Sequence, residues 1–339
     1  MDDSAVRALC ALFDLGAPGA APTAVAGGLT NRLWRLETER GIFAVKQMNR
    51  DFDRVDYVDW FERAFALEQA CFAAGVPMPR PLPVAATGRC LGEFPGPGAQ
   101  PITVRAHEWL EGVKLDNSAP HPAEVAARVG SILARIHALR MTSEVTAAEA
   151  LRVFGDEHWR TLLDRLERAD GDWAGTLHGL LPALRDLEAY LLAAHDDPTP
   201  LLLSHRDSDM KNFMRTPAGE LLLVDWDQAG PVNPRQDLAN EALVWAGLHL
   251  RDPDPALARA YIEAYRLGAG TSERFRATDL AELVAVRLGW FDFNVHRALG
   301  ERVRDASDIA VGANVVRRNL TELPRFARSL DTWLAVLGD

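Results

Sequence analysis

Residues 204–225 read SHRDSDMKNFMRTPAGELLLVD, and this stretch says most about the fold and the chemistry of the chain. Four residues separate Asp207 from Asn212, and Asp225 follows after a turn and the apolar run LLLV. The stretch thus supplies a carboxylate, an amide and a second carboxylate at defined separations. Oxygen atoms of this kind bind Mg²⁺ and orient hydroxyl groups. The spacing therefore predicts an enzyme that transfers phosphate.

The composition indicates a compact protein with two lobes. The chain has 339 residues, too many for one small core, and 48% of them are hydrophobic and 25% charged. The net charge of −11 and the pI near 5.3 disfavour nucleic acid and anionic membranes as partners, because those partners are held by lysine and arginine. A cationic or neutral small molecule fits this charge better, although acidity also serves solubility.

The cysteines and the N-terminus carry no targeting or disulfide signal. Cys10, Cys71 and Cys90 are too few and too scattered for a disulfide framework or a CxxC metal site, so we expect buried thiols. The N-terminal residues lack a basic segment followed by a long apolar core. No uncharged apolar run approaches the roughly 18 residues of a membrane span. A cytoplasmic location is the default expectation.

The first lobe begins with a predicted β-hairpin. The segment LTNRLWRLETERGIFAVKQMN, residues 29–49, contains two strands joined at ETERG. Period-2 alternation puts Ile42, Ala44 and Lys46 on one face of the second strand. The small Ala44 leaves room for a flat ligand on the face that carries Lys46.

A helix with an internal carboxylate follows the hairpin. The apolar stripe of VDWFERAFALEQACFAAG contains Phe61, Phe65 and Phe72, and Glu68 falls inside it at helical spacing. An unpaired carboxylate in such a stripe is unfavourable, so Glu68 needs a cation. We expect Lys46 to be that cation, with Glu62 on the same helix as the alternative partner of Lys46.

The remaining pattern predicts an α+β fold. Residues 80–110 suggest two more strands, the second being ITVRAHEWL, and the chain turns helical after Gly112. We expect a small N-terminal lobe, residues 1–106, with an antiparallel sheet and a helix. A hinge at 107–112 and a larger, mainly α-helical lobe at 113–339 follow. No GxxxxGK[ST] loop occurs, so a nucleotide must be held in another way.

These motifs occur in an order that resembles a known family. An AVK strand, a helix with an internal carboxylate, HRDxxxxN and LLLVD follow one another at compatible separations. The chain is similar to the aminoglycoside phosphotransferase and choline kinase family, which has the bilobal protein-kinase-like fold. The matching motifs run over nearly the whole chain: GGLTN, FAVK, AAGVPMPRP, HEWLEG, SHRDSDMKN and VDWDQAGPVNP. VDWD resembles these small-molecule kinases more than protein kinases, which carry DFG.

The resemblance implies a role for each residue of the nucleotide and metal site. Asp207 is similar to the catalytic base, Asn212 and Asp225 to the Mg²⁺ ligands, and Lys46 to the phosphate-binding lysine. The Glu108 carbonyl and the Leu110 amide would bind adenine. The turn before the first strand of the hairpin would bring backbone amides close to the phosphates. Its candidate residues are Gly27, Gly28 and Asn31.

The acceptor side is where the chain departs from the family pattern. Many relatives have HGDLHxGN, whereas Arg206, Asp209 and Lys211 stand here in place of Gly, His and Gly. Asp209 could contact a substrate amine or hydroxyl, or it could rigidify the loop. Asp227 could face the metal or the acceptor, or brace its loop.

A predicted helix offers further acceptor residues. The segment LGWFDFNVHRALG supplies Trp290 and Asp292, which could stack on a ring and bind hydroxyls, while its aromatic residues could equally belong to a core.

The function predicted is a small-molecule kinase. It would transfer the γ-phosphate of ATP or GTP, with Mg²⁺, to a hydroxyl of an antibiotic such as an aminoglycoside, as in antibiotic resistance. Alternatives are a metabolic kinase of an amino alcohol or sugar, and a nucleotide-binding pseudokinase without turnover. A metal-dependent hydrolase with His205 and Asp207 as ligands would need a further histidine cluster, which the sequence lacks.

Overall fold

The computed structural model describes residues 2–25, 31–48, 57–95, 101–116, 118, 121–169, 173, 175–248, 253–272, 274–303 and 305–338. The chain forms two compact units, one of residues 1–116 with 210–230 and the other of residues 117–209 with 231–339. The lobe and hinge bounds predicted from the sequence remain a prediction. The compact units differ from them chiefly in that residues 210–230 fold with the N-terminal part of the chain.

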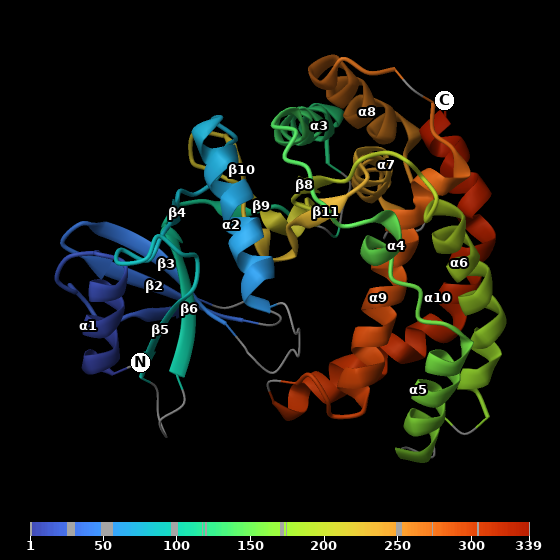
Figure 1. The fold of residues 1–339 in the computed structure, drawn as a ribbon, viewed down its shortest axis with the longest axis horizontal. Coiled ribbons are helices and arrows are strands. Elements are labelled where there is room, and N and C mark those ends of the chain that lie inside the picture. The colour runs from blue at the N-terminus through green and yellow to red at the C-terminus, as the bar shows by residue number, and fades with distance from the viewer. Residues whose placement is uncertain are drawn as a thin grey trace. The chain divides into compact units, whose positions relative to one another are not determined.

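An antiparallel sheet forms the centre of the first unit (Figure 1). Its strands are β1 (Thr23–Val25), β2 (Arg32–Thr38), β3 (Gly41–Gln47), β4 (Pro81–Leu82), β5 (Gly92–Pro95) and β6 (Pro101–Glu108). The order is β1-β2-β3-β6-β4, and β5 also pairs with β6. The hairpin predicted at ETERG is confirmed, because β2 and β3 pair in register from Arg32↔Gln47 to Thr38↔Gly41.

The two faces of this sheet have different surroundings. Phe43 and Val45 of β3 are buried in a core with Val6 and Leu9 of α1 (Asp3–Leu12). Their neighbours in sequence point to the opposite face, as the period of two requires. Lys46 therefore lies on the face opposite this core. The helix predicted over 58–75 is α2 (Tyr57–Ala73).

The stretch that decides the chemistry supplies the last part of the first unit. It contains η4 (Met210–Asn212), β9 (Phe213–Arg215), β10 (Leu221–Leu223) and η5 (Trp226–Gln228). β9 pairs with β10 and with β7 (Val113–Lys114), all antiparallel. The strand predicted at LLLV is confirmed as β10. The backbone N–H of Val224 donates to the Asn212 carbonyl at 2.8 Å, which fixes the residue before Asp225 beside Asn212.

The second unit is mainly helical, as predicted. Its elements are α3 (Ala123–Ala138), α4 (Ala147–Ala150), α5 (Asp156–Ala169), η3 (Leu177–Leu180), α6 (Leu181–Ala194), α7 (Pro234–Trp245), α8 (Pro255–Ala269), η7 (Ala277–Leu280), α9 (Ala281–Ala298) and α10 (Ala306–Gly338), and β8 (Leu202–Ser204) pairs with β11 (Gly230–Val232). α9 runs alongside α10, and α3 packs on α8 (Figure 1). A Cβ on Gly130 of α3 would lie 2.2 Å from the Tyr261 carbonyl oxygen of α8, so only glycine permits this approach. Among the described helices, none is both long and apolar enough to cross a bilayer.

Candidate active site

Lys46 lies between two carboxylates of the segment that follows β10. Its Nζ donates to Asp225 Oδ1 at 2.7 Å and to Asp227 Oδ2 at 2.8 Å. Burial alone would lower the pKa of Lys46, but the two carboxylates outweigh burial and raise it above its usual value. Lys46 is therefore charged at neutral pH, as a phosphate-binding lysine must be.

The predicted pairing of Lys46 with Glu68 is wrong. Glu68 is fully buried in the α2 stripe, as expected, but both its oxygens accept from Arg105 Nη2, at 2.6 and 2.5 Å. β3 and β6 pair with Lys46 opposite Arg105, so the two cations project from the same face. Arg105 binds Glu68 through Nη2 and Asp227 through Nη1, whereas Lys46 binds Asp225 and Asp227.

The alternative partner of Lys46 is also engaged elsewhere. Glu62 accepts from Arg89 Nε and from the Cys90 backbone N–H, each at 3.2 Å.

Glu68 is more deeply buried than Glu62, and its burial affects its pKa. Burial would raise the pKa of Glu68, but Arg105 and His107 outweigh it and lower this pKa to about 2. Glu68 thus stays ionised and balances the buried guanidinium.

Asp227 is shared by several donors of the first unit. Its Oδ1 accepts from Arg105 Nη1 at 3.0 Å, and its Oδ2 accepts from Lys46 and from Asn31 Nδ2 at 2.9 Å. The Trp60 indole N–H donates to the Asp227 carbonyl at 3.1 Å. Both carboxylate oxygens of Asp227 are therefore engaged in hydrogen bonds. This favours the alternative that Asp227 braces its loop over the alternative that it contacts the acceptor. The sequence analysis did not identify Arg105, although period-2 alternation in ITVRAHEWL separates it from the apolar face.

Asn212 and Asp225 form the candidate metal site. Asn212 is buried and tied to Val224 through its carbonyl, while the Asp225 side chain is 44% exposed. Asp225 has φ of 68°, a left-handed conformation that is uncommon outside glycine. A carboxylate and an amide oxygen on adjacent segments suit the oxygen preference of Mg²⁺. Among the described residues no group of three or more His, Cys, Asp or Glu could hold a metal ion.

Asp207, the predicted base, lies in the second unit, three residues after the end of β8. It is half-buried, and its backbone N–H donates to His205 Nδ1 at 3.3 Å. The next residue, Ser208, donates its N–H to Glu241 Oε1 at 3.3 Å and accepts from the Trp245 indole at 2.8 Å. α7 therefore holds the loop on the C-terminal side of Asp207. Asp209 is half-buried on the same loop.

Buried polar residues that the sequence analysis missed support β8 and this loop. Asp237 Oδ2 accepts from Ser204 Oγ at 2.5 Å and lies 3.0 Å from His137 Nε2, while His137 Nδ1 lies 2.8 Å from the Tyr265 hydroxyl. Burial, the neighbouring Asp237 and the acids of the loop raise the pKa of Glu241 well above its usual value. The sequence signal for this cluster is the pair of acids Asp237 and Glu241, which lie one helical turn apart in the buried helix α7.

The predicted acceptor residues on α9 differ in exposure. Trp290 is 39% exposed, and its ring stacks on Phe293 with centroids 5.7 Å apart. The Asp292 side chain is only 6% exposed, and it accepts from His158 Nε2 at 2.8 Å and from Arg302 at 3.3 Å. Asp292 is thus held inside the second unit, whereas Trp290 faces outward.

The structure describes only some of the residues whose backbone is predicted to contact the nucleotide. Glu108 ends β6, and its N–H donates to the Arg80 carbonyl at 3.0 Å; Leu110 follows two residues later. The adenine contacts remain a prediction. Gly27 and Gly28 lie outside the described residues.

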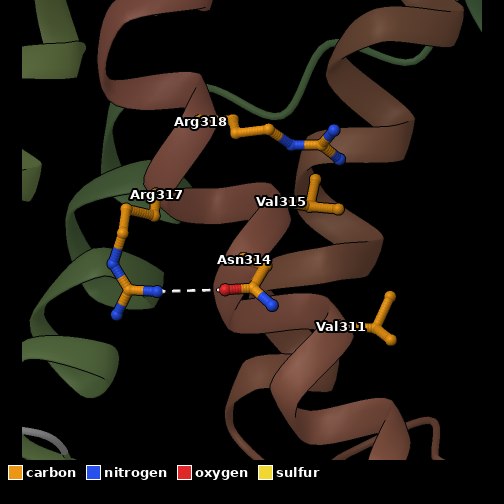
Figure 2. A pocket seen from close by; sticks show the side chains of 5 residues that line it. All are labelled: Val311, Asn314, Val315, Arg317 and Arg318. Carbon is orange, nitrogen blue, oxygen red and sulfur yellow. Dashed lines mark hydrogen bonds between the residues drawn. The ribbon is translucent and has the colours of Figure 1, made fainter.

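Two hollows in the described part of the second unit contain none of the predicted site residues in their linings. One, of about 420 Å³, lies on α10 and is lined by Val311, Asn314, Val315, Arg317 and Arg318, with Arg317 donating to Asn314 at 3.1 Å (Figure 2). The other, of about 410 Å³, includes His137 and Tyr265 in its wall. Neither lining contains an aspartate or a glutamate.

Comparison with known proteins gives the family. Residues 22–278 match the phosphotransferase enzyme family. Spectinomycin phosphotransferase in complex with ADP and spectinomycin has a similar structure, with a TM-score of 0.66 and 11% identity over 97% of this chain and 98% of the other. Amicoumacin kinase in complex with AMP-PNP and Ca²⁺ is also similar, with a TM-score of 0.61 and 16% identity over 95% of this chain and 94% of the other.

A kinase of an amino alcohol is also among the structural neighbours. Choline kinase from Streptococcus pneumoniae gives a TM-score of 0.60 and 12% identity over 94% of this chain and 99% of the other. No curated protein sequence matches significantly. At these identities the solved structures establish the fold, while the family match covers well over half of the chain. The chain belongs to the phosphotransferase enzyme family and has the protein-kinase-like fold of its small-molecule kinases.

Proposed function

We propose that the protein transfers the γ-phosphate of ATP or GTP, with Mg²⁺, to a hydroxyl group of an amine-bearing, ring-containing small molecule such as an aminoglycoside-type antibiotic. The observation that carries the proposal is the charged Lys46 bound to Asp225, whose preceding residue is tied to Asn212. One local cluster thereby offers a cation for phosphates and two oxygen donors for the metal, which are the parts that phosphoryl transfer requires.

The residues of the first unit have separate tasks in this reaction. Lys46 would contact the nucleotide phosphates while Asp227 and Arg105 keep its side chain in place. Asn212 and Asp225 would hold Mg²⁺, which screens the charge of the phosphates when bound. Arg105, which is paired with the buried Glu68, also binds Asp227 and so helps to hold it in place.

The catalytic loop would handle the acceptor. Asp207 would accept a hydrogen bond from the acceptor hydroxyl and take its proton as the hydroxyl oxygen bonds to the γ-phosphorus and the nucleoside diphosphate leaves. The loop is held by α7 through Ser208, so the carboxylate is positioned before the acceptor arrives.

An aromatic surface on α9 supports the choice of acceptor class. We define the α9 face as Val286, Gly289, Trp290 and Phe293, which fall on one side of the helix. Val286 is 45% and Trp290 39% exposed, and a Cβ on Gly289 would meet no atom within 4 Å. An exposed tryptophan binds sugar or aromatic rings and attracts amines through its π face. The net charge of −11 also favours a cationic acceptor.

The test is a phosphate-transfer assay with ATP or GTP and Mg²⁺ against aminoglycosides, peptide and nucleoside antibiotics, choline-like amines and sugars. We expect a phosphorylated ring-bearing amine, and we expect Asp207→Asn to lower kcat by about 10²-fold or more while the nucleotide still binds. Phosphorylation of choline-like amines alone would favour the metabolic kinase instead. Thermal stabilisation by nucleotide without transfer to any acceptor would indicate a pseudokinase, and full turnover by Asp207→Asn would remove Asp207 from the role of base.

A further inference from the structure

Arg206, the residue before Asp207, has a backbone conformation that disfavours arginine. Its φ is 61°, in the left-handed region where a Cβ crowds the following carbonyl. Glycine occupies this region without that crowding, and glycine stands at this position in the family pattern quoted above. The side chain of Arg206 must therefore make contacts that offset the conformation of its backbone.

Those contacts are made to one buried carboxylate on α9. Arg206 Nε and Nη2 both donate to Glu282 Oε1, at 3.0 and 2.8 Å. The Glu282 side chain is 2% exposed and that of Arg206 18%. A carboxylate so deeply buried is unfavourable without a cation, and the planar guanidinium supplies charge and two donors in a fixed geometry. The ion pair thus offsets both the unfavourable backbone conformation of Arg206 and the burial of the Glu282 carboxylate.

This ion pair completes a second anchor for the catalytic loop. On the C-terminal side of Asp207, Ser208 is bound to Glu241 and Trp245 of α7. On the N-terminal side, Arg206 is bound to Glu282 in the first turn of α9. Asp207 therefore lies between one anchor on α7 and one on α9.

The α9 anchor lies on the same side of the helix as the α9 face. Glu282 precedes Val286 by four residues and Gly289 by seven, which is helical spacing for one side. The buried Glu282 therefore lies one helical turn before the first residue of the acceptor surface proposed above.

We propose that Arg206 is a positioning residue whose ion pair with Glu282 couples the α9 face to Asp207. This inference rests on the proposed function, because the base and the acceptor surface are those of the phosphate transfer. Arg206 itself transfers no proton. It holds the backbone of the loop so that the neighbouring carboxylate is in place when an acceptor occupies α9.

The test compares Arg206→Gly, Glu282→Gln and the double variant with the parent enzyme, using the acceptor found in the panel. Glycine suits the left-handed backbone, so Arg206→Gly removes the ion pair without straining the loop, and the double variant also removes the buried charge of Glu282. We expect each single variant to lower kcat by about 10- to 100-fold, since small misplacements of reacting groups have effects of this size. The KM for ATP should stay unchanged, because Lys46, Asn212 and Asp225 are untouched. The double variant should be no slower than the slower single variant, because both changes remove one interaction.

A matched control comes from the same helix. Arg287 of α9 pairs with Glu322 at 3.2 Å, and both side chains are about a third exposed, so Arg287→Ala should leave kcat unchanged. Amide hydrogen exchange of residues 204–209 gives a readout without turnover, and it should be faster in Glu282→Gln but not in Arg287→Ala. If the parent protein transfers no phosphate, the proposed function is refuted. The hydrogen-exchange rates of residues 204–209 then show on their own whether Glu282 anchors the loop. Unchanged kcat and unchanged exchange in Arg206→Gly would overturn the inference.

Discussion

Replacing Glu68 by glutamine should destabilise the first unit by about 3 kcal/mol at neutral pH. Folding lowers the pKa of Glu68 from 4.5 to about 2, and each tenfold change in proton affinity corresponds to about 1.4 kcal/mol. Breaking a buried ion pair by removing one partner costs a similar amount, about 3–5 kcal/mol. Because the pKa is lowered in the folded state, this contribution is complete well above pH 4.5 and is lost as the pH falls toward 2.

The assay is urea unfolding of the full chain at pH 7 and at several lower pH values. Glu62→Gln is the matched control on the same helix, since its carboxylate is 27% exposed and its ion pair with Arg89 should contribute less than about 1 kcal/mol. The difference between the parent and Glu68→Gln should narrow below pH 4.5. Equal costs of the two substitutions at pH 7 would refute the assignment of Glu68 as the counter-ion of Arg105.

Two further substitutions test the acceptor surface and the helical unit. Trp290→Ala should raise the KM for a ring-bearing acceptor about 10-fold while the KM for ATP stays constant, measured by steady-state kinetics; an unchanged acceptor KM would argue against the α9 face. Gly130→Ala should lower the free energy of unfolding by about 1–3 kcal/mol, because its Cβ would lie 2.2 Å from the Tyr261 carbonyl oxygen. Gly289→Ala, whose Cβ would meet open space, should be neutral or slightly stabilising in the same denaturation assay, and equal losses in both would contradict the steric explanation.

Glu68 illustrates how far the sequence leads in the first unit. Helical spacing predicts that Glu68 points inward, and the structure confirms this with a fully buried side chain. The same spacing predicts a buried Phe72, which is 40% exposed. Periodicity gives the facing of each residue in its own element, but it does not give the register between strands. The Lys46↔Arg105 pairing of β3 and β6 therefore could not be predicted, and the partner of Glu68 was missed.

The catalytic loop shows a second limit of the same kind. Motif spacing predicts Asp207, Asn212 and Asp225, because chemistry fixes their separation along the chain. The residues that hold the loop, Glu241 and Glu282, lie far away in sequence and have no motif of their own. Their signal is a buried acid in a helix, and burial of a helix face emerges only when the helices are packed. The departure of Arg206 from glycine was visible in the sequence, while its φ of 61° and its partner were not.

The charge arrangement of the first unit links Lys46 to the candidate metal site. Two cations, Lys46 and Arg105, share Asp227, and Lys46 also binds Asp225. Lys46 is therefore held by the segment that carries the candidate metal ligand, rather than by the carboxylate of α2. If Asp225 turns to Mg²⁺ and Lys46 to the phosphates, Asp227 still binds both cations and keeps Lys46 in place. The position of Lys46 and the position of the candidate metal ligand thus both depend on the short segment that carries Asp225 and Asp227, so a change of either aspartate should affect both.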